Sequence, residues 1–155
     1  MKKIGQVSER PSGRARHRIL YVEDNDVNWS VIELRLGATY ELTRAATDRD
    51  ACEVLTQQPD LYAILMDVEL AGSKLNGIQL TRLIRGKLPE HERPPYAAHV
   101  PTLDVPVLFV TAYAAVHAHS RLLEAGADIV LAKPVDFTKL NLALTKLFLN
   151  RSRAR

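Results

Sequence analysis

Five short apolar runs recur along the chain, and each is followed by a stretch whose apolar residues have helical spacing. A short apolar run is typical of a strand, and a longer periodic stretch between two such runs is typical of a crossover helix. The alternation therefore predicts an α/β fold built on a doubly wound parallel sheet. The expected strands are residues 19–22, 40–45, 62–66, 107–110 and 129–132.

The helices between these strands are expected over about 27–36, 48–58, 78–85, 114–124 and 137–149. Asp48 and Asp136 stand where they can cap the second and the last helix. Gly37 is expected to end the first one. The apolar pattern of that first helix is carried by Val27, Val31, Ile32, Leu34 and Leu36.

A length of 155 residues is near the commonest size of one globular domain. We expect a flexible basic extension at 1–17, one folded domain at 18–150 and a basic tail at 151–155. The domain includes a proline-rich insertion at about 86–106, where prolines at 89, 94, 95, 101 and 106 disfavour a regular helix or strand. An insertion of this length is expected to be either functional or mobile.

Composition excludes several classes of protein. The net charge of +3 comes largely from basic residues at the two ends, where no aromatic residues interleave with them, so nucleic-acid binding is disfavoured. No apolar run approaches the roughly 20 residues of a membrane-spanning helix, and the start lacks the apolar core of a secretory signal. We therefore expect a cytoplasmic protein with no membrane partner. The single cysteine, Cys52, excludes an internal disulfide.

Charged and hydroxyl side chains stand directly after four of the five expected strands. In a parallel sheet the carboxyl ends of the strands meet at one edge, so groups that are distant in sequence become neighbours there. Singly, each of them is more often a helix cap, a turn residue or a solvated lysine. Their joint placement is what favours a site, and its members are Glu23, Asp24, Asp67, Thr111 and Lys133.

The three carboxylates of this set predict a divalent metal site. Crowded carboxylates repel one another unless a hard cation lies among them, and oxygen ligands suit Mg²⁺. An aspartate beside such an ion can attack phosphorus, and we assign this role to Asp67. Lys133 and the hydroxyl of Thr111 could then stabilise the charge on the phosphoryl oxygens.

Four segments, "ILYVEDN", "AILMDVEL", "VLFVTA" and "GADIVLAKP", resemble in order and spacing the signature positions of response-regulator receiver domains of two-component systems. The resemblance covers residues 18 to about 149. It implies a flavodoxin-like fold with strand order 2-1-3-4-5, a phosphoacceptor at Asp67 and a cis peptide bond between Lys133 and Pro134. It also implies a Mg²⁺ site formed by Glu23, Asp24, Asp67 and the backbone carbonyl of Glu69.

The same resemblance implies a phosphorelay. The expected phosphodonor is a sensor histidine kinase or a histidine phosphotransfer protein, and the expected activity is that of a switch with slow self-dephosphorylation. The output partner is unknown, and a homodimer stays open. The chain departs from the family pattern at Ala71, where proline is common, and at Val130, which replaces an aromatic residue. The loop from Asp67 to Gly77 is longer than usual, and Tyr113 places an aromatic ring two residues after Thr111.

Two other functions stay open on the sequence. A haloacid dehalogenase-like phosphatase would use Asp67 as nucleophile and Glu69 as general acid, but in that family the nucleophile follows the first strand. A pseudo-receiver would bind partners without phosphorylation, which the intact acidic set disfavours. We interpret all five histidines as structural or solvated. His117 and His119 face different directions on a helix, and His91 and His99 lie in the insertion with no thiol or carboxylate cluster beside them.

Overall fold

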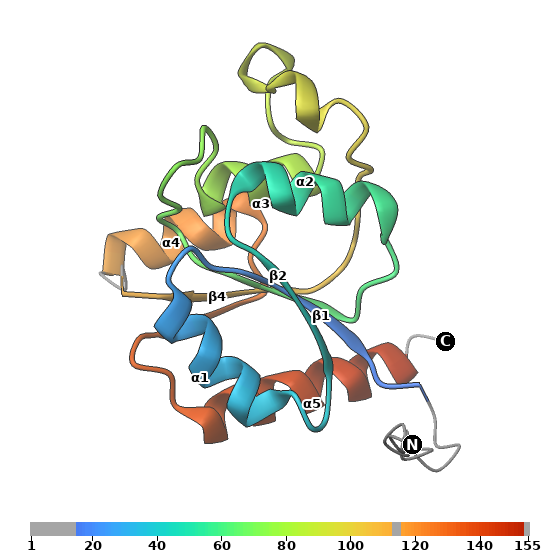
Figure 1. The fold of residues 1–155 in the computed structure, drawn as a ribbon, viewed down its shortest axis with the longest axis vertical. Helices are drawn as coiled ribbons and strands as arrows, with labels where there is room; N and C mark the ends of the chain where they lie inside the picture. Colours follow the sequence, from blue (N-terminus) through green and yellow to red (C-terminus); the bar gives the residue numbers. More distant parts are fainter. Residues whose placement is uncertain (1–14, 113–115, 154–155) are drawn as a thin grey trace, which may run out of the picture.

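The computed structural model describes residues 15–112 and 116–153. Within them, five parallel strands form one sheet in the order β2-β1-β3-β4-β5 (Figure 1). This arrangement confirms the doubly wound fold predicted from the sequence pattern and the strand order implied by the resemblance. The strands are β1 (Arg18–Val22), β2 (Glu41–Ala45), β3 (Ala63–Met66), β4 (Val107–Thr111) and β5 (Ile129–Ala132).

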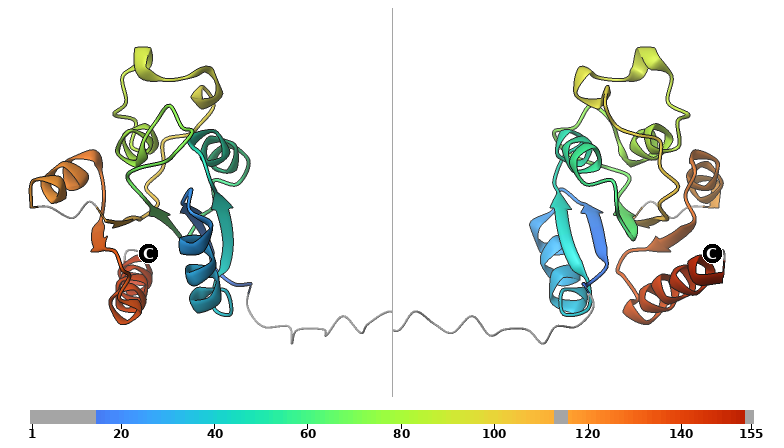
Figure 2. Two further views of the ribbon diagram at one scale, coloured as in Figure 1. Left: turned by 60° about the vertical axis from the view of Figure 1, so that its left-hand side comes forward. Right: turned by 90° about the vertical axis from the view of Figure 1, so that its right-hand side faces the viewer.

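Helices cover both faces of the sheet. In Figures 1 and 2, α1 and α5 lie on one face, and α2, α3 and α4 lie on the other. Their bounds are α1 (Asp26–Leu36), α2 (Asp48–Gln57), α3 (Gly77–Ile84), α4 (Val116–Ala125) and α5 (Phe137–Arg153). Because α5 ends at Arg153, the residues at 151–153 of the expected basic tail are helical.

The core has two halves, one on each face of the sheet. Successive residues of a strand point to opposite faces, so β1 gives Leu20 and Val22 to one half and Ile19 and Tyr21 to the other. The strands β3 and β4 are buried along their whole length, as expected of central strands covered on both faces. The carboxyl ends of these strands are thereby held at one fixed edge.

Only part of the apolar pattern of α1 is covered by other elements. Ile32 and Leu36 are buried, but Val27 and Leu34 are 70% and 83% exposed, and Val31 is also exposed. Periodicity places residues on a helix face, but it does not say whether a neighbouring element covers that face. The helix begins at Asp26, close to the expected start. Asn25 caps this end, because its side chain accepts a hydrogen bond from the backbone N–H of Asn28.

The prediction that Asp48 caps α2 was wrong. Thr47 is the cap, and its hydroxyl accepts a hydrogen bond from the backbone N–H of Asp50 at 3.2 Å. Asp48 is the first residue of the helix, and its side chain is buried. At the last helix, by contrast, the carboxylate of Asp136 accepts a hydrogen bond from the N–H of Lys139, as predicted.

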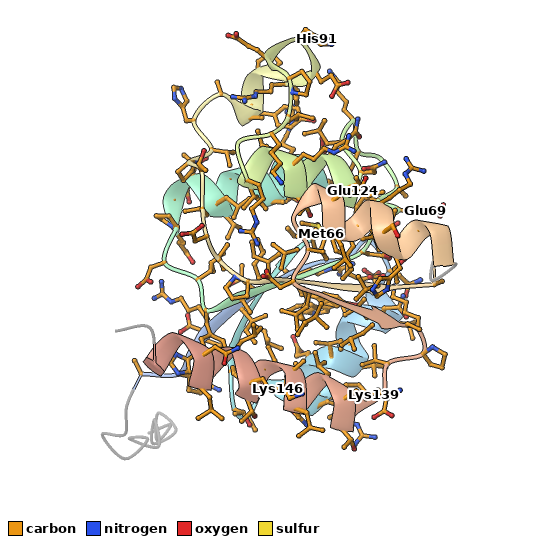
Figure 3. All side chains as sticks on the ribbon, turned by 180° about the vertical axis from the view of Figure 1, so that it is seen from behind. Met66, Glu69, His91, Glu124, Lys139 and Lys146 are labelled. Atoms are coloured by element: carbon orange, nitrogen blue, oxygen red, sulfur yellow. The ribbon has the colours of Figure 1, made fainter. Side chains whose placement is uncertain are left out.

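The proline-rich insertion extends beyond α2 and α3 (Figure 2). It contains two short 3₁₀ helices, η1 (Glu90–Glu92) and η2 (Pro95–Ala97), in place of regular α-helix or strand. Leu88, Ala97 and Val105 are buried in the same half of the core as α2 and α3. His91 is exposed at the outer end of the segment (Figure 3).

Candidate functional site

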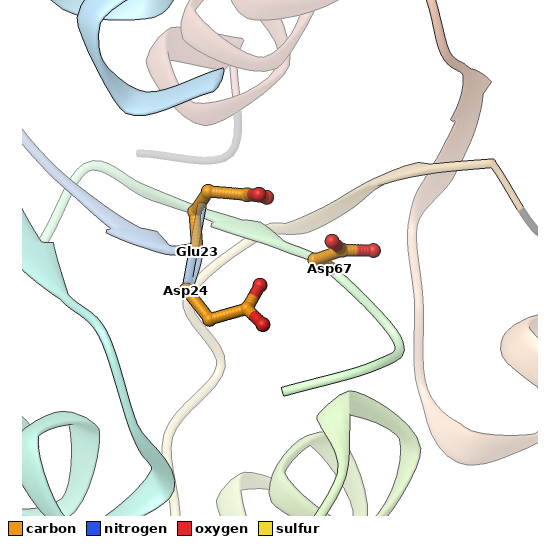
Figure 4. Close-up of side chains that lie close together, drawn as sticks. All are labelled: Glu23, Asp24 and Asp67. Carbon is orange, nitrogen blue, oxygen red and sulfur yellow. The ribbon is translucent and has the colours of Figure 1, made fainter. Parts of the chain in front are cut away.

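Three carboxylates gather at the carboxyl edge of the sheet, as the strand-end pattern predicts. Glu23 and Asp24 follow β1, and Asp67 follows β3, which pairs with β1 in the sheet. One oxygen from each lies within 4.8 Å of the others (Figure 4). The neighbouring strands therefore bring together acids that are more than forty residues apart in the chain.

Asp67 is nearly buried and is held by two donors. Its Oδ1 accepts a hydrogen bond from the backbone N–H of Val68 at 2.8 Å, and its Oδ2 accepts one from Lys133 Nζ at 2.9 Å. Burial and the charge of Glu23 raise the pKa of Asp67, while Lys133 opposes them. The carboxylate is thus positioned next to a cation, in surroundings that favour neutralisation of its charge.

Glu23 is fully buried, and both of its oxygens accept hydrogen bonds. Oε1 accepts from the side-chain amide of Asn28 at 2.9 Å, and Oε2 accepts from Lys133 Nζ at 3.0 Å and from the Tyr21 hydroxyl at 3.3 Å. Burial, followed by the nearby charge of Glu23, raises the pKa of Tyr21, so this hydroxyl keeps its proton. Sequence reasoning missed Tyr21 and Asn28, although Tyr21 precedes Glu23 by two residues, the spacing that places side chains on one face of a strand.

Asp24 is only partly buried. Its Oδ2 accepts a hydrogen bond from the backbone N–H of Ala71 at 3.0 Å, which joins it to the loop that follows Asp67. Arg44, a third residue that sequence reasoning missed, donates to the backbone carbonyls of Glu23 and Asp24 at 3.1 Å each. The guanidinium therefore fixes the backbone of the acidic pair. It does not occupy the Asp24 carboxylate, which faces the site.

Lys133 bridges the two most buried acids of the site. Burial lowers the pKa of Lys133, but its hydrogen bonds to Asp67 and Glu23 outweigh that effect, and the net pKa is raised. The lysine is therefore charged at neutral pH. The peptide bond that follows it, to Pro134, is cis, which confirms the expectation from the resemblance.

Thr111 ends β4 and is buried. Its backbone carbonyl accepts a hydrogen bond from the N–H of Lys133 at 2.9 Å, so the ends of β4 and β5 are joined at the site. Glu69 lies exposed in the loop after Asp67 (Figure 3), and the role of its carbonyl stays a prediction. Tyr113 lies outside the described residues.

The residues present fit Mg²⁺. Three carboxylates share the site with one ammonium group, so negative charge is in excess, and all the acidic donors are oxygens, the ligands that a hard cation prefers. The cluster is also asymmetric. Glu23 has donors on both oxygens, whereas Asp24 is partly exposed.

A model of the response regulator receiver domain matches residues 19–145, which is well over half of the chain. The chain belongs to the response regulator receiver domain family. Receiver domains are phosphoacceptor switches, and the roles of the five strand-end residues in this receiver stay a prediction. Within the described residues, no helix is long and apolar enough to cross a membrane.

Three known proteins illustrate the relationship. The transcriptional regulatory protein ZraR of Escherichia coli is 31% identical over 130 residues, which are 83% of this chain and 25% of ZraR, so this chain spans about a quarter of that relative. The receiver domain of the sensor histidine kinase PA1611 of Pseudomonas aeruginosa is 34% identical with a TM-score of 0.67, over 86% of this chain and 98% of that one. Its structure holds a magnesium ion in the active-site cleft.

The third is the receiver domain of Ssk1 from Saccharomyces cerevisiae, solved in complex with the histidine phosphotransfer protein Ypd1. It is 23% identical with a TM-score of 0.67, and the match covers 85% of this chain and 88% of that one. At this identity the likeness shows the fold alone. None of these three likenesses supports the phosphatase alternative.

Proposed function

We propose that this receiver accepts a phosphoryl group on Asp67 from a phosphohistidine, with Mg²⁺ bound by Asp24, Asp67 and the backbone carbonyl of Glu69, and with Glu23 beside them. The observation that carries the proposal is the 2.9 Å contact between Lys133 Nζ and Asp67 Oδ2 inside the acidic cluster. A lysine in this place can stabilise the negative charge of the carboxylate before transfer and the negative charge of the phosphoryl group after it. The magnesium ion of the PA1611 receiver domain supports the metal assignment.

The proposed transfer uses the residues described at the carboxyl edge of the sheet. An oxygen of Asp67 attacks phosphorus, a new O–P bond forms, and the P–N bond to the donor imidazole breaks with its electron pair leaving on nitrogen. Mg²⁺, when bound, neutralises charge on the phosphoryl oxygens. Lys133, which now bridges Asp67 and Glu23, supplies a further positive charge, and the Thr111 hydroxyl is proposed as a donor. The product is an aspartyl phosphate.

The proposed docking surface for the phosphodonor is the exposed apolar stripe of α1, made of Val27, Val31 and Leu34. Their spacing places them on one face of the helix, and the face begins next to the acidic pair. They line a shallow hollow of about 300 Å³ together with Asp26 and Ser30. An apolar stripe of this kind suits the apolar face of a partner helix. A histidine phosphotransfer protein is the partner of the receiver domain in the Ssk1 complex.

The proposed output route runs from Thr111 into α4 and β5. A phosphoryl group that draws Thr111 toward the site would move the start of the following helix, and Val130 cannot act as an aromatic reporter. The output protein is unnamed, and a homodimer stays a prediction. We propose that this receiver lies in the cytoplasm, where it would receive its phosphoryl group from a sensor histidine kinase or a histidine phosphotransfer protein.

Labelling with acetyl phosphate and Mg²⁺, read by intact mass, tests the phosphoacceptor. We expect one phosphoryl group on the parent chain, none on Asp67→Asn, and unchanged labelling of the control Asp60→Asn, which alters an exposed acid before β3. Equal labelling of Asp67→Asn would contradict the assignment. Sustained turnover of a small phosphoester would favour the phosphatase. Absence of labelling by both acetyl phosphate and a cognate kinase would favour the pseudo-receiver.

The docking surface is tested with Leu34→Ser. Transfer from a phosphorylated histidine phosphotransfer protein should slow by about tenfold, as at the centre of an interface, while labelling by acetyl phosphate should not change. The matched control is Leu142→Ser, which removes an exposed leucine from α5. If both variants slow the transfer equally, the stripe is not the docking surface.

A further inference from the structure

The proline-rich insertion reaches the loop after the phosphoacceptor through one buried carboxylate. Asp48, at the start of α2, is 2% exposed. Its Oδ2 accepts hydrogen bonds from the hydroxyl of Tyr96, in the insertion, and from the backbone N–H of Leu75, in the loop between β3 and α3, at 2.9 Å for the latter. One oxygen atom therefore joins three segments that are separate in the sequence.

The remaining bonds of Asp48 keep this carboxylate in one orientation. Its Oδ1 accepts from the backbone N–H of Arg49 at 2.8 Å, and its own N–H donates to the hydroxyl of Ser73 at 2.9 Å. The guanidinium of Arg49 also lies over the ring of Tyr96, 4.8 Å from its centroid. Burial, and then the bond to Asp48, raise the pKa of Tyr96, so the hydroxyl stays a donor at neutral pH.

The loop that Asp48 holds is the loop that carries part of the site. It begins at Asp67, includes Glu69, and is joined to the acidic pair where the N–H of Ala71 donates to Asp24 at 3.0 Å. The loop also bonds to Asp48 through Ser73 and Leu75, and within the loop the N–H of Gly77 donates to the carbonyl of Val68 at 2.8 Å. The loop is thus held between the acidic site at one end and α2 at the other.

The insertion can act as a fixed support because it is anchored independently of Tyr96. The backbone N–H of Leu103 donates to the carbonyl of Ile84 at 2.8 Å, and Arg85 donates to the carbonyl of Leu103 at 2.8 Å. Leu88 and Ala97 are buried in the core on either side of Tyr96. The hydroxyl of Tyr96 is therefore presented to Asp48 by a segment with its own packing.

We propose that Tyr96 is a positioning residue of the phosphoacceptor site, which acts through Asp48 to hold the loop between β3 and α3 in the conformation that binds Mg²⁺. The magnesium part of the proposal rests on the proposed function. Without the hydroxyl, a buried carboxylate loses one of its donors and is drawn toward water, and the bond to Leu75 weakens with it. The loop then samples positions in which Ala71 and Glu69 are displaced from the site.

The test compares Tyr96→Phe with the control Tyr40→Phe, which removes a hydroxyl from the opposite half of the core. In metal-free protein, hydrogen exchange of the loop amides, including Leu75 and Ala71, should be about fivefold faster in Tyr96→Phe alone. Magnesium affinity, followed by the fluorescence of the single tryptophan Trp29, should fall by a similar factor. Tyr40→Phe should leave both quantities at the parent value.

A second comparison separates positioning from general stability. Asp48→Asn should reproduce the faster exchange, and adding Tyr96→Phe to it should change exchange and magnesium affinity little further, because both act on one contact. Additive effects would overturn the proposal. So would a Tyr96→Phe variant that is less stable to urea but has parental loop exchange and magnesium affinity. If the parent chain itself binds no Mg²⁺, the proposed function fails, and loop exchange in metal-free protein still decides the role of Tyr96.

Discussion

The acidic site has two sides that differ in how their carboxylates are held. On the side toward α1, which we call the buried side, Glu23 is fully buried and bonded on both oxygens by Asn28, Tyr21 and Lys133. On the other, the open side, Asp24 is partly exposed and contacts the loop at Ala71. Two acids adjacent in the chain thus have different tasks. Glu23 holds the lysine, whereas Asp24 is proposed to supply charge for a cation.

The largest effect is expected when the buried side loses its cation. Lys133→Met leaves Glu23 and Asp67 without the ammonium group, and Lys133 is 16% exposed, so little water replaces it. We expect a loss of about 3 kcal/mol in the free energy of unfolding of metal-free protein, measured with urea. Lys139→Met, at an exposed position of α5, is the control and should change it little. Equal stability of the two variants would show that Glu23 does not depend on the lysine.

The open side should respond in the opposite way. Asp24→Asn removes one of three crowded carboxylates, so the metal-free protein should keep or gain stability, while magnesium affinity falls by about tenfold, or about 1.4 kcal/mol. Magnesium titration of the parent and of Asp60→Asn gives the reference. A variant that binds Mg²⁺ like the parent would remove Asp24 from the metal site.

The hydroxyl of Tyr21 tests the buried side without changing its charge at neutral pH. At neutral pH, Tyr21→Phe should lower the free energy of unfolding by about 1 kcal/mol, the typical contribution of one hydrogen bond. In the unfolded chain, Tyr21 releases its proton above the ordinary tyrosine pKa of 10.0, whereas in the folded protein it keeps that proton. The free energy of unfolding of the parent protein therefore falls as the pH rises past 10.0. The contribution of Lys133, whose pKa is raised from 10.5, is likewise present below that pH and lost above it.

Urea unfolding at neutral pH and at about pH 10.5 measures this difference, because that pH lies above the ordinary tyrosine pKa. The parent should lose more stability than Tyr21→Phe between the two conditions, since the variant has no proton to release at this position. An equal loss in both would mean that Tyr21 ionises in the folded protein as it does in the unfolded chain.

The smallest effect is expected at Glu69, on the open side. Its carboxylate is exposed and would add negative charge near a phosphoryl group on Asp67, which disfavours attack by water. Glu69→Ala should therefore lose its label about twofold to threefold faster, a modest change for a solvent-screened charge. Decay of the labelled protein over time measures this. Slower decay would instead identify Glu69 as a base for the attacking water.

The sequence alone determined the sheet and the members of the acidic site. Apolar runs are buried as strands, and the residue after each strand of a parallel sheet lies at the same edge of the sheet. Glu23, Asp67 and Lys133 therefore come together through the pairing of the strands, independently of how the helices pack. The lysine is 110 residues from Glu23 in the chain, yet the pairing of strands fixes their proximity.

Only the tertiary structure decided which side chains surround that site and which faces stay open. Asp48 has the sequence context of a helix cap, but it is buried, and it accepts hydrogen bonds from Leu75, 27 residues away, and from Tyr96, 48 residues away. Leu34 has the spacing of a core residue, yet no described element covers it. Local pattern determines the face on which a side chain lies, and burial depends on what packs against that face, which is set by contacts between segments distant in the sequence.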